Sequence, residues 1–151
     1  MNYMTHTCPS GLRLIHLPSS SKVVFCGFAV KAGSRNEAKD EEGLAHFCEH
    51  MTFKGTKRRS SVQIINAIEG VGGELNAFTN KEDTVFYASI TRDHFRQAVD
   101  VLTDIVFNSQ FPQSEIEKER EVVAMRLKAT KTLLQNLSSM ISTIFFSKVI
   151  L

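Results

Sequence analysis

Two stretches near the N-terminus have the hydrophobic pattern of β-strands. Residues 11–17 (GLRLIHL) alternate apolar and polar side chains, the period of two that is typical of a half-buried strand. Residues 22–33 (KVVFCGFAVKAG) form a longer apolar run that ends in glycine, and the turn sequence PSSS separates the two stretches. We therefore expect a hairpin or two adjacent strands at the start of the chain.

A helical period follows the polar loop SRNEAKDEE. Leu44, Phe47, Cys48 and Met51 recur at i, i+3, i+4 and i+7, so they share one face of an α-helix. We expect this face to be buried. Residues 60–73 (SSVQIINAIEGVGG) predict a second helix, which serine opens and glycines stop.

The second half of the chain mixes strands and helices again. Residues 74–80 and 84–90 predict two strands around the sequence KED, and residues 92–109 predict a third helix. The apolar residues expected on one side of that helix are Phe95, Val99, Leu102 and Val106.

A fourth helix is expected after the sequence FPQS. Ser114 can act as its N-cap, and Glu115 and Glu117 favour the first turn electrostatically. Strands and helices thus follow each other in an α+β order, without the regular alternation of a doubly wound fold. We expect a mixed, largely antiparallel sheet packed with helices.

Composition and charge argue against several classes of protein. A net charge of +2 argues against electrostatic binding of nucleic acid, and we expect the only dense basic cluster, KGTKRR at residues 54–59, to be a solvated loop. Cys8, Cys26 and Cys48 have neither a disulfide-framework spacing nor a CxxC pair, which favours a reducing compartment. The chain shows no signal peptide and no apolar run of membrane-spanning length. We therefore expect a cytoplasmic protein that binds no membrane.

The C-terminal end differs in composition from the rest of the chain. All 16 acidic residues, all 8 glycines and all 3 prolines lie at or before Glu121. Residues 1–121 carry 14 basic against 16 acidic side chains, a net charge of −2, whereas the remaining residues carry four basic side chains and no acidic ones, a net charge of +4. We therefore divide the chain into residues 1–123 and an atypical tail, residues 124–151.

The sequence HFCEHMTFKGT (residues 46–56) carries the candidate chemistry. On a helix, His46 and His50 project from the same face one turn apart, so both imidazoles can reach a single metal ion. Glu49 lies on an adjoining face, where it can take a proton from a metal-bound water without being a ligand. This HxxEH order is the inverse of the common zinc-protease order. The alternative is that both histidines are ordinary surface or core residues and that Glu49 only stabilises the helix.

Several separate motifs agree in order and spacing with one family. EEGLAHFCEHMTFKGT, preceded by VKAGSRNE and followed by GGELNAFTNKEDTVFYA, resembles the N-terminal zinc-binding domain of the insulinase (pitrilysin, mitochondrial processing peptidase) family of metallopeptidases, in particular its bacterial processing-peptidase-like members. The resemblance extends from about Gly11 to Val123. It implies an α+β metallopeptidase domain, a Zn2+ cofactor, and hydrolysis of peptides or unfolded segments. It also implies further homologous domains or a homologous subunit that close over the substrate.

The resemblance assigns roles to individual residues. His46 and His50 match the family's two histidine ligands, and Glu49 matches the general base that activates the zinc-bound water. GGELNAFT matches a segment in which an edge strand pairs with an extended substrate. The alternative for this segment is an ordinary turn and strand. The substrate contacts that the resemblance implies are Asn76, Ala77 and Phe78.

Glu119 and Arg126 decide whether the site is complete. Glu119 lies 69 residues after His50, where the family keeps an acidic residue that supports the catalytic site; the alternative is a solvated helix charge. The family's third zinc ligand is a glutamate two helical turns later, and here that position holds Arg126. Arginine does not deprotonate in proteins and cannot ligate a metal. We therefore expect weak zinc binding and a poor or inactive peptidase.

The arginine coincides with the change in composition, and one cause explains both. We hypothesise that residues from about 124 onward are translated out of frame. Because methionine has the single codon ATG, the shifted codon that spans Met125 and Arg126 begins with G; it encodes Glu if the arginine codon is AGA or AGG, and Ala otherwise. The shifted frame is compatible with the acidic, proline-containing sequence NEIESYKDTPSELIFDDFDDFLF. The first glutamate of this shifted sequence falls at the place of Arg126.

Other accounts of the tail and of the whole chain stay open. The tail can instead be a genuine amphipathic helix or a partner-binding segment. Its apolar stripe would be Leu127, Leu134, Leu137 and Ile141. The chain can also be a non-catalytic binding or structural subunit, or a truncated product with no function of its own. The intact HxxEH motif argues against the non-catalytic subunit.

Overall fold

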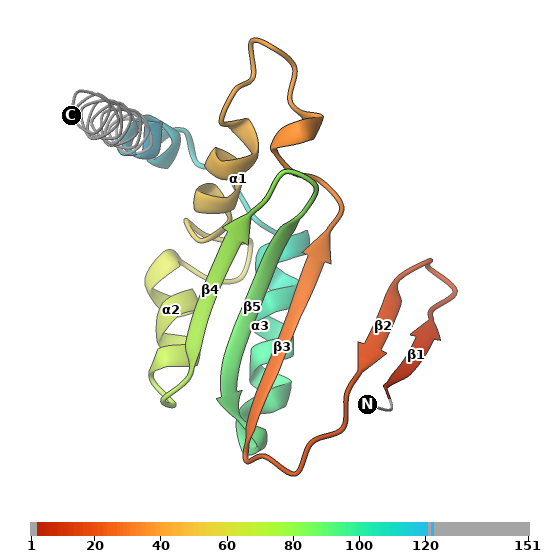
Figure 1. Cartoon of the computed structure of the whole chain (residues 1–151). Coiled ribbons are helices and arrows are strands. Elements are labelled where there is room, and N and C mark those ends of the chain that lie inside the picture. Colours follow the sequence, from red (N-terminus) through yellow and green to blue (C-terminus); the bar gives the residue numbers. More distant parts are fainter. Residues whose placement is uncertain (1–2, 121, 123–151) are drawn as a thin grey trace, which may run out of the picture.

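The computed structural model describes residues 3–120 and 122 of the chain. Its longer strands are β3 (Val23–Val30), β4 (Glu74–Thr79) and β5 (Thr84–Thr91). Its helices are α1 (Leu44–Thr52), α2 (Ser61–Glu69) and α3 (Phe95–Phe107), with short 3₁₀ turns η1 (Ser34–Asn36) and η2 (Arg92–His94). The three strands form an antiparallel sheet in the order β3-β5-β4, and α2 and α3 pack against one face of it (Figure 1). The expected α+β fold is confirmed.

The N-terminal strands β1 (Met4–Thr7) and β2 (Arg13–His16) form a hairpin of their own, apart from the main sheet (Figure 1). Gly11, at φ +85°, lies in the turn between them, in a conformation that glycine adopts without strain. Because β2 pairs with β1 and β3 pairs with β5, the expectation that residues 11–17 and 22–33 form neighbouring strands is wrong. A tight turn instead pairs β2 with β1, the strand before it in the chain, which is too short to show a hydrophobic pattern.

The core lies between the inner face of the sheet and helices α2 and α3. Every second residue of β5 is buried, because successive side chains of a strand point to opposite faces. Burying each large aliphatic side chain in this layer contributes about 1.5–3 kcal/mol to stability. The buried apolar residues are Ile64, Ile68, Phe86, Ala88, Ile90, Ala98, Val101, Leu102 and Ile105.

Helix α3 buries only part of the predicted face. Of the four predicted residues, Leu102 is buried and Val106 packs against the core, but Phe95 is 41% and Val99 is 36% exposed. The buried apolar side of α3 is formed by Ala98, Val101, Leu102 and Ile105. Periodicity identifies the helix correctly, but the apolar arc is wider than the strip that the sheet covers.

Helix α1 differs from its prediction in the same way. Leu44 and Cys48 are exposed, although the spacing predicted that they would face the core. Met51 is buried as predicted, and the other buried residues of α1 are Glu49 and Thr52. The helix therefore turns its glutamate inward, which an apolar count cannot predict.

The helix boundaries agree with the sequence in one case and differ in another. Ser60 caps α2 as predicted, with its hydroxyl accepting from the Gln63 N–H at 3.4 Å and the Gln63 side chain accepting from the Ser60 N–H at 2.8 Å. The last helix covers residues 113–120, and the carbonyl of Pro112 accepts its first hydrogen bonds. Ser114 therefore lies inside the first turn, and its prediction as the N-cap is wrong.

Candidate metal centre

Helix α1 carries the HxxEH motif and lacks a capping side chain at its own N-terminus. Its N-cap is Gly43, at φ +92°. The carboxylate of Glu37 supplies the missing acceptors, from the Gly43 N–H at 3.0 Å and the Ala45 N–H at 2.8 Å. A negative charge at this end also favours the helix dipole. Glu37 could not be predicted from the sequence, because a capping residue normally lies next to the helix and this one comes from the preceding loop.

The two histidines of the motif face each other. His46 Nε2 and His50 Nε2 lie 3.1 Å apart, and their rings are edge to face with centroids 4.5 Å apart. Together with a carboxylate oxygen of Glu49, these atoms lie within 4.8 Å of one another. Imidazole nitrogens and carboxylate oxygens are common ligands of zinc, so the group has a suitable set of donors.

Glu119 supports His50 from behind. Its Oε1 lies 2.6 Å from His50 Nδ1, and its Oε2 lies 2.5 Å from Lys54 Nζ. Glu119 is only 5% exposed, so the alternative of a solvated helix charge is wrong. Burial raises the pKa of the Glu119 carboxyl, but hydrogen bonds from Lys54 and His50 outweigh that effect and leave the pKa below its usual value.

This contact decides which nitrogen of His50 faces the metal position. An ionised carboxylate can only accept hydrogen bonds, so Nδ1 of His50 carries the proton that it donates to Glu119. In the neutral ring Nε2 then presents a lone pair toward His46. That is the nitrogen and the protonation state that a metal ligand requires.

Glu49 is held by the sheet rather than by its own helix. The hydroxyl of Thr79, at the end of β4, donates a hydrogen bond to Glu49 Oε2. Thr84 lies opposite Thr79 on β5, with the two hydroxyl oxygens 3.4 Å apart, and donates to the carbonyl of Ala32 at 2.9 Å. The contact of Thr79 with Glu49 could not be predicted from the sequence, because the two residues are 30 positions apart.

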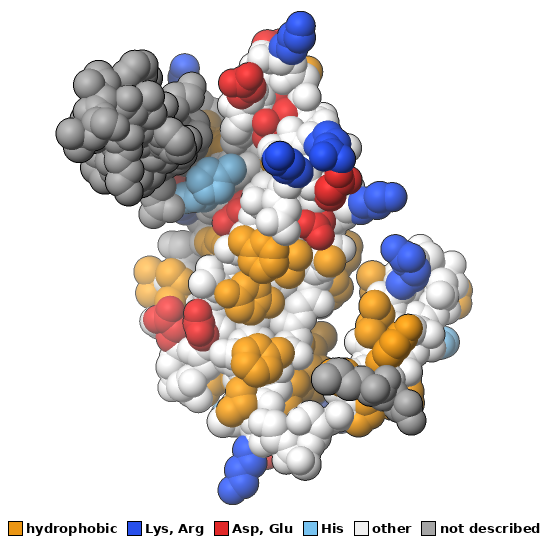
Figure 2. Space-filling view, in the orientation of Figure 1, with side chains coloured by type: hydrophobic (Ala, Val, Ile, Leu, Met, Phe, Trp, Pro, Cys, Tyr) orange, Lys and Arg blue, Asp and Glu red, His pale blue; other side chains and the backbone are white. Residues whose placement is uncertain are grey.

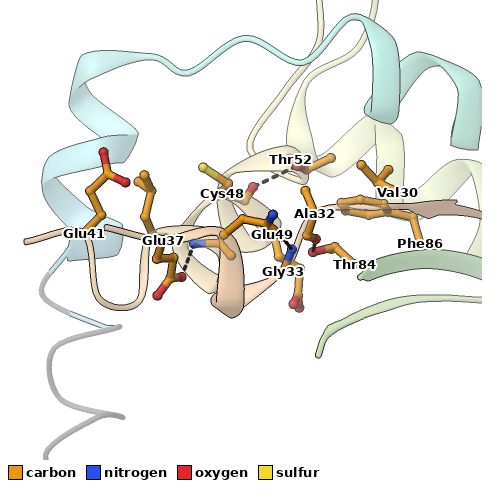
Figure 3. A pocket seen from close by; sticks show the side chains of 13 residues that line it. Val30, Ala32, Gly33, Glu37, Glu41, Cys48, Glu49, Thr52, Thr84 and Phe86 are labelled. Carbon is orange, nitrogen blue, oxygen red and sulfur yellow. Dashed lines mark hydrogen bonds between the residues drawn. The ribbon is translucent and has the colours of Figure 1, made fainter. Parts of the chain in front are cut away.

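A pocket of about 280 Å³ opens beside Glu49 (Figure 3). Val30, Ala32 and Phe86 form part of its largely apolar wall. Gly33 also lines it, and a Cβ at this position would lie 2.4 Å from the Asn80 carbonyl oxygen. Only glycine therefore lets this loop approach the β4–β5 hairpin so closely.

Strand β4 offers a free edge near the site. Asn80 N–H donates to Asp83 O, and hydrogen-bonded pairs alternate along an antiparallel ladder, so the backbone N–H and C=O of Ala77 point away from β5. The Ala77 N–H is covered by the side chain of Asn76, whose Oδ1 accepts at 2.9 Å. Phe78 is 44% exposed, whereas the side chain of Ala77 packs against the core. A ligand at Ala77 would therefore contact its backbone rather than its side chain.

The basic segment after α1 is only in part the solvated loop that the sequence predicted, because Lys57 and Arg58 are exposed but Arg59 is not. Arg59 forms ion pairs with Asp100 and Asp104, and Arg58 pairs with Asp100 at 3.1 Å. The Arg59 side chain is only 17% exposed, and the Asp104 side chain is 0% exposed. The acidic residues of α3 thus bind the segment, because charges 41 to 45 positions apart in sequence meet in the fold.

Arg126 and the predicted tail, residues 124–151, lie outside the described residues. Within residues 3–120 and 122, the group of side chains that could hold a metal ion is His46, Glu49 and His50. Over the same part of the chain, no helix combines the length and the apolar character needed to cross a membrane.

Relatives of the chain are zinc proteases and processing peptidases. The family model described as insulinase (peptidase family M16) matches residues 14–148. The chain is 40% identical over 125 residues to the uncharacterized zinc protease YmxG of Bacillus subtilis (strain 168), and 42% identical over 130 residues to the human mitochondrial-processing peptidase subunit beta. These matches cover 82% and 85% of this chain but 30% and 27% of the relatives. The chain thus spans less than a third of their length.

Solved structures have the same fold. A protease from Helicobacter pylori matches with a TM-score of 0.80 and 26% identity, over 83% of this chain and 30% of that chain. Pitrilysin matches with a TM-score of 0.77 and 25% identity, over 87% of this chain and 14% of that chain. Because the family model covers nearly the whole sequence, the chain belongs to the insulinase family, peptidase family M16.

Proposed function

We propose that His46 and His50 hold a zinc ion and that Glu49 is the general base of an insulinase-type metalloendopeptidase. One observation carries this proposal: two imidazole Nε2 atoms lie 3.1 Å apart, with a carboxylate of Glu49 in the same group of donors. The buried Glu119 behind His50 supports it, because histidines that bind zinc usually donate their other ring N–H to such a partner.

The chemistry would be divided between the metal and the residues around it. Zinc bound there would act as a Lewis acid and lower the pKa of a water molecule. Thr79 binds Oε2 of Glu49, so Oε1 is the oxygen that can accept a proton. Glu119 keeps Nε2 of His50 directed at the ligand position. These contacts fix the proton acceptor and the ligand before substrate binds.

We further propose that an extended peptide or unfolded protein segment binds along the free edge of β4. Its backbone would pair with the Ala77 N–H and C=O once the Asn76 side chain moves aside. Phe78 and Asn76 would contact substrate side chains from the exposed face of the strand. The same strand ends at Thr79, so one element would position both the substrate and the general base.

The proposed zinc site lacks the third ligand that the family has. Arg126 stands where the family has a glutamate, so we propose that this chain alone is a weak or inactive peptidase. We also propose that residues 124–151 are out of frame, which sequencing of the coding DNA tests. Another frame that opens near codon 124 with glutamate at the place of Arg126 is the expected result; a closed or unrelated frame would contradict it.

A non-catalytic role is the alternative, and Arg126 is the observation that favours it. In that case the chain would be a binding or structural subunit that works with a homologous domain or subunit. The human relative is itself named a subunit. The relatives include a bacterial and a mitochondrial protein, so a cytoplasmic location remains a prediction.

Zinc titration of the whole chain tests the proposed function. We expect one zinc ion per chain, measured by competition with a chromophoric chelator, and loss of that binding in His46→Ala. His94→Ala is the matched control, because His94 lies at the start of α3 and outside the metal group. Undetectable zinc binding by the unchanged chain, or equal binding by His46→Ala, would contradict the proposal.

A further inference from the structure

We propose that Lys54 is a positioning residue of the metal site, which holds Glu119 against His50 and so selects the ring nitrogen that faces the metal. The inference rests on the proposed function for its consequence in metal binding. Its structural part, the control of His50, concerns the protein without metal and can be tested by itself.

The two oxygens of the Glu119 carboxylate have different partners. Lys54 Nζ lies 2.5 Å from Oε2 of Glu119, while His50 Nδ1 lies 2.6 Å from Oε1. Lys54 is four residues after His50, in the turn that ends α1, and its backbone N–H donates to Met51 O at 3.0 Å. His50 and Lys54 therefore reach Glu119 from the same end of one helix, and the carboxylate cannot turn without breaking one of the two contacts.

Burial makes the lysine necessary. The Glu119 side chain is only 7% exposed, and a carboxylate out of water needs a compensating charge as well as hydrogen bonds. A neutral imidazole supplies a hydrogen bond but no charge. Among the described residues, Lys54 is the cation that pairs with Glu119, and its own side chain is 29% exposed. Without Lys54, Oε2 would lose its donor, and the carboxylate would turn toward water.

The consequence would reach the metal position through His50. Glu119 requires the proton of His50 on Nδ1, which leaves Nε2 as the acceptor that faces His46. If Glu119 turns away, His50 can place its proton on Nε2 instead, and that tautomer cannot bind a metal through Nε2. Lys54 thus acts on a metal ligand through an intermediate carboxylate and does not contact the metal.

The neighbouring cations of the same segment provide a contrast. Arg58 and Arg59 are bound by the aspartates of α3, on another side of the loop. Lys57 forms no ion pair within residues 3–120 and 122. Removing the positive charge of Lys57 should therefore leave the tautomer of His50 unchanged. Lys57→Met is thus a matched control for Lys54→Met.

The test uses the full chain without metal and then with zinc. Long-range ¹H–¹⁵N NMR distinguishes a protonated from an unprotonated ring nitrogen and so reports the tautomer of His50. We expect the Nδ1–H form in the unchanged chain, Lys54→Arg and Lys57→Met, and a mixture with the Nε2–H form in Lys54→Met. Zinc affinity should fall by roughly 10- to 100-fold in Lys54→Met and stay nearly constant in the other two variants.

The outcomes separate this inference from the proposed function. An altered tautomer in Lys54→Met supports the role of Lys54 even if the unchanged chain binds no zinc, a result that would overturn only the proposed function. A His50 that keeps Nδ1–H in Lys54→Met would overturn the inference, whatever the zinc affinity. If Lys54→Met does not fold, Lys54→Gln provides the same readouts, because it also removes the charge.

Discussion

Two clusters of charged and polar side chains lie next to α1, and they differ in what their atoms face. In the first, Asp104 accepts from Thr56 at 2.7 Å, from Arg59 at 2.5 Å and from Asn108 at 3.2 Å, so donors and acceptors satisfy one another. In the second, Glu119 and Lys54 support His50 from behind, and the front of the cluster consists of two Nε2 atoms that face each other.

The difference fits a structural role for the first cluster and the proposed metal-binding role for the second. Buried polar groups in a cluster that is closed on itself need no further partner, and such a cluster stabilises the fold. A cluster in which two imidazole nitrogens converge on one point is suited to a metal ion from outside the chain. The first cluster ties the segment after α1 to α3, and the second carries the proposed zinc site.

The largest expected effect separates the two clusters by metal binding. His50→Ala should lower zinc affinity by more than the roughly 10- to 100-fold that loss of an outer partner costs, because it removes a direct ligand. Competition with a chelator measures this affinity. Asp104→Asn should bind zinc like the unchanged chain, and a similar loss in both variants would show that the clusters are not separate.

Stability should respond in the opposite way. Asp104→Ala leaves Arg59 with only the exposed Asp100 as a partner, and breaking a buried ion pair costs up to about 3–5 kcal/mol in free energy of unfolding. The His50 side chain is 13% exposed, and its removal leaves Glu119 paired with Lys54, so His50→Ala should cost less. Urea unfolding of both variants measures these free energies. A His50→Ala variant that is less stable than Asp104→Ala would contradict this assignment.

Glu119 belongs to the second cluster, but its effect on metal binding should be smaller than that of a ligand. Glu119→Gln keeps the shape and loses the charge, so zinc affinity should fall by about 10- to 100-fold. Glu117→Gln is the control, because Glu117 lies on the same helix and contacts Gln113 rather than His50. Equal affinities for the two variants would mean that Glu119 does not support the site.

Thr79 joins the proposed base to the sheet, and its removal should have a moderate effect. Thr79→Val takes away the hydrogen bond to Glu49, which should cost about 1.5–3 kcal/mol in stability for a bond to a charged group. Thr79→Ser keeps the hydroxyl and should cost less. Valine favours strands more than serine does, so β-propensity alone would give the opposite order. Denaturant unfolding of the two variants decides between these orders.

The first cluster should contribute less to the stability of the fold at low pH. Burial raises the pKa of Asp104, but hydrogen bonds from Thr56, Arg59 and Asn108 and the charge of Arg59 outweigh it, so folding lowers the pKa. Such a group stabilises the fold fully above its unfolded pKa of about 4 and loses that contribution as pH falls through its folded pKa. The stability advantage over Asp104→Asn should therefore shrink below about pH 4. An advantage that stays constant in urea unfolding from about pH 6 to about pH 3 would contradict this.

Local spacing predicted the parts of the fold and site that depend on neighbours in sequence. The α+β order, the capping of α2 by Ser60, and the shared face of His46 and His50 all follow from patterns within a few residues. The partners of the site residues could not be predicted in this way. Thr79 and Lys54 contact Glu49 and Glu119 across 30 and 65 positions, and only the folded chain brings them together.

The predictions of the buried faces of α1 and α3 were only partly right, for a related reason. An apolar period shows which side of a helix could be buried, but the width of the covering layer decides which side chains are. Phe95 and Leu44 stay exposed because the described elements do not cover them. Their spacing could not reveal this.

Zinc affinity of Arg126→Glu tests the central claim most directly. The proposed site has two histidines and, in place of a third ligand, a cation at residue 126. A glutamate there should raise zinc affinity by at least the roughly 100-fold upper limit of outer-partner effects, because it adds a direct ligand. Lys128→Glu, with the same change of charge two residues later, should raise it little. Equal affinities for the two variants would contradict a zinc site on α1 that lacks only its third ligand.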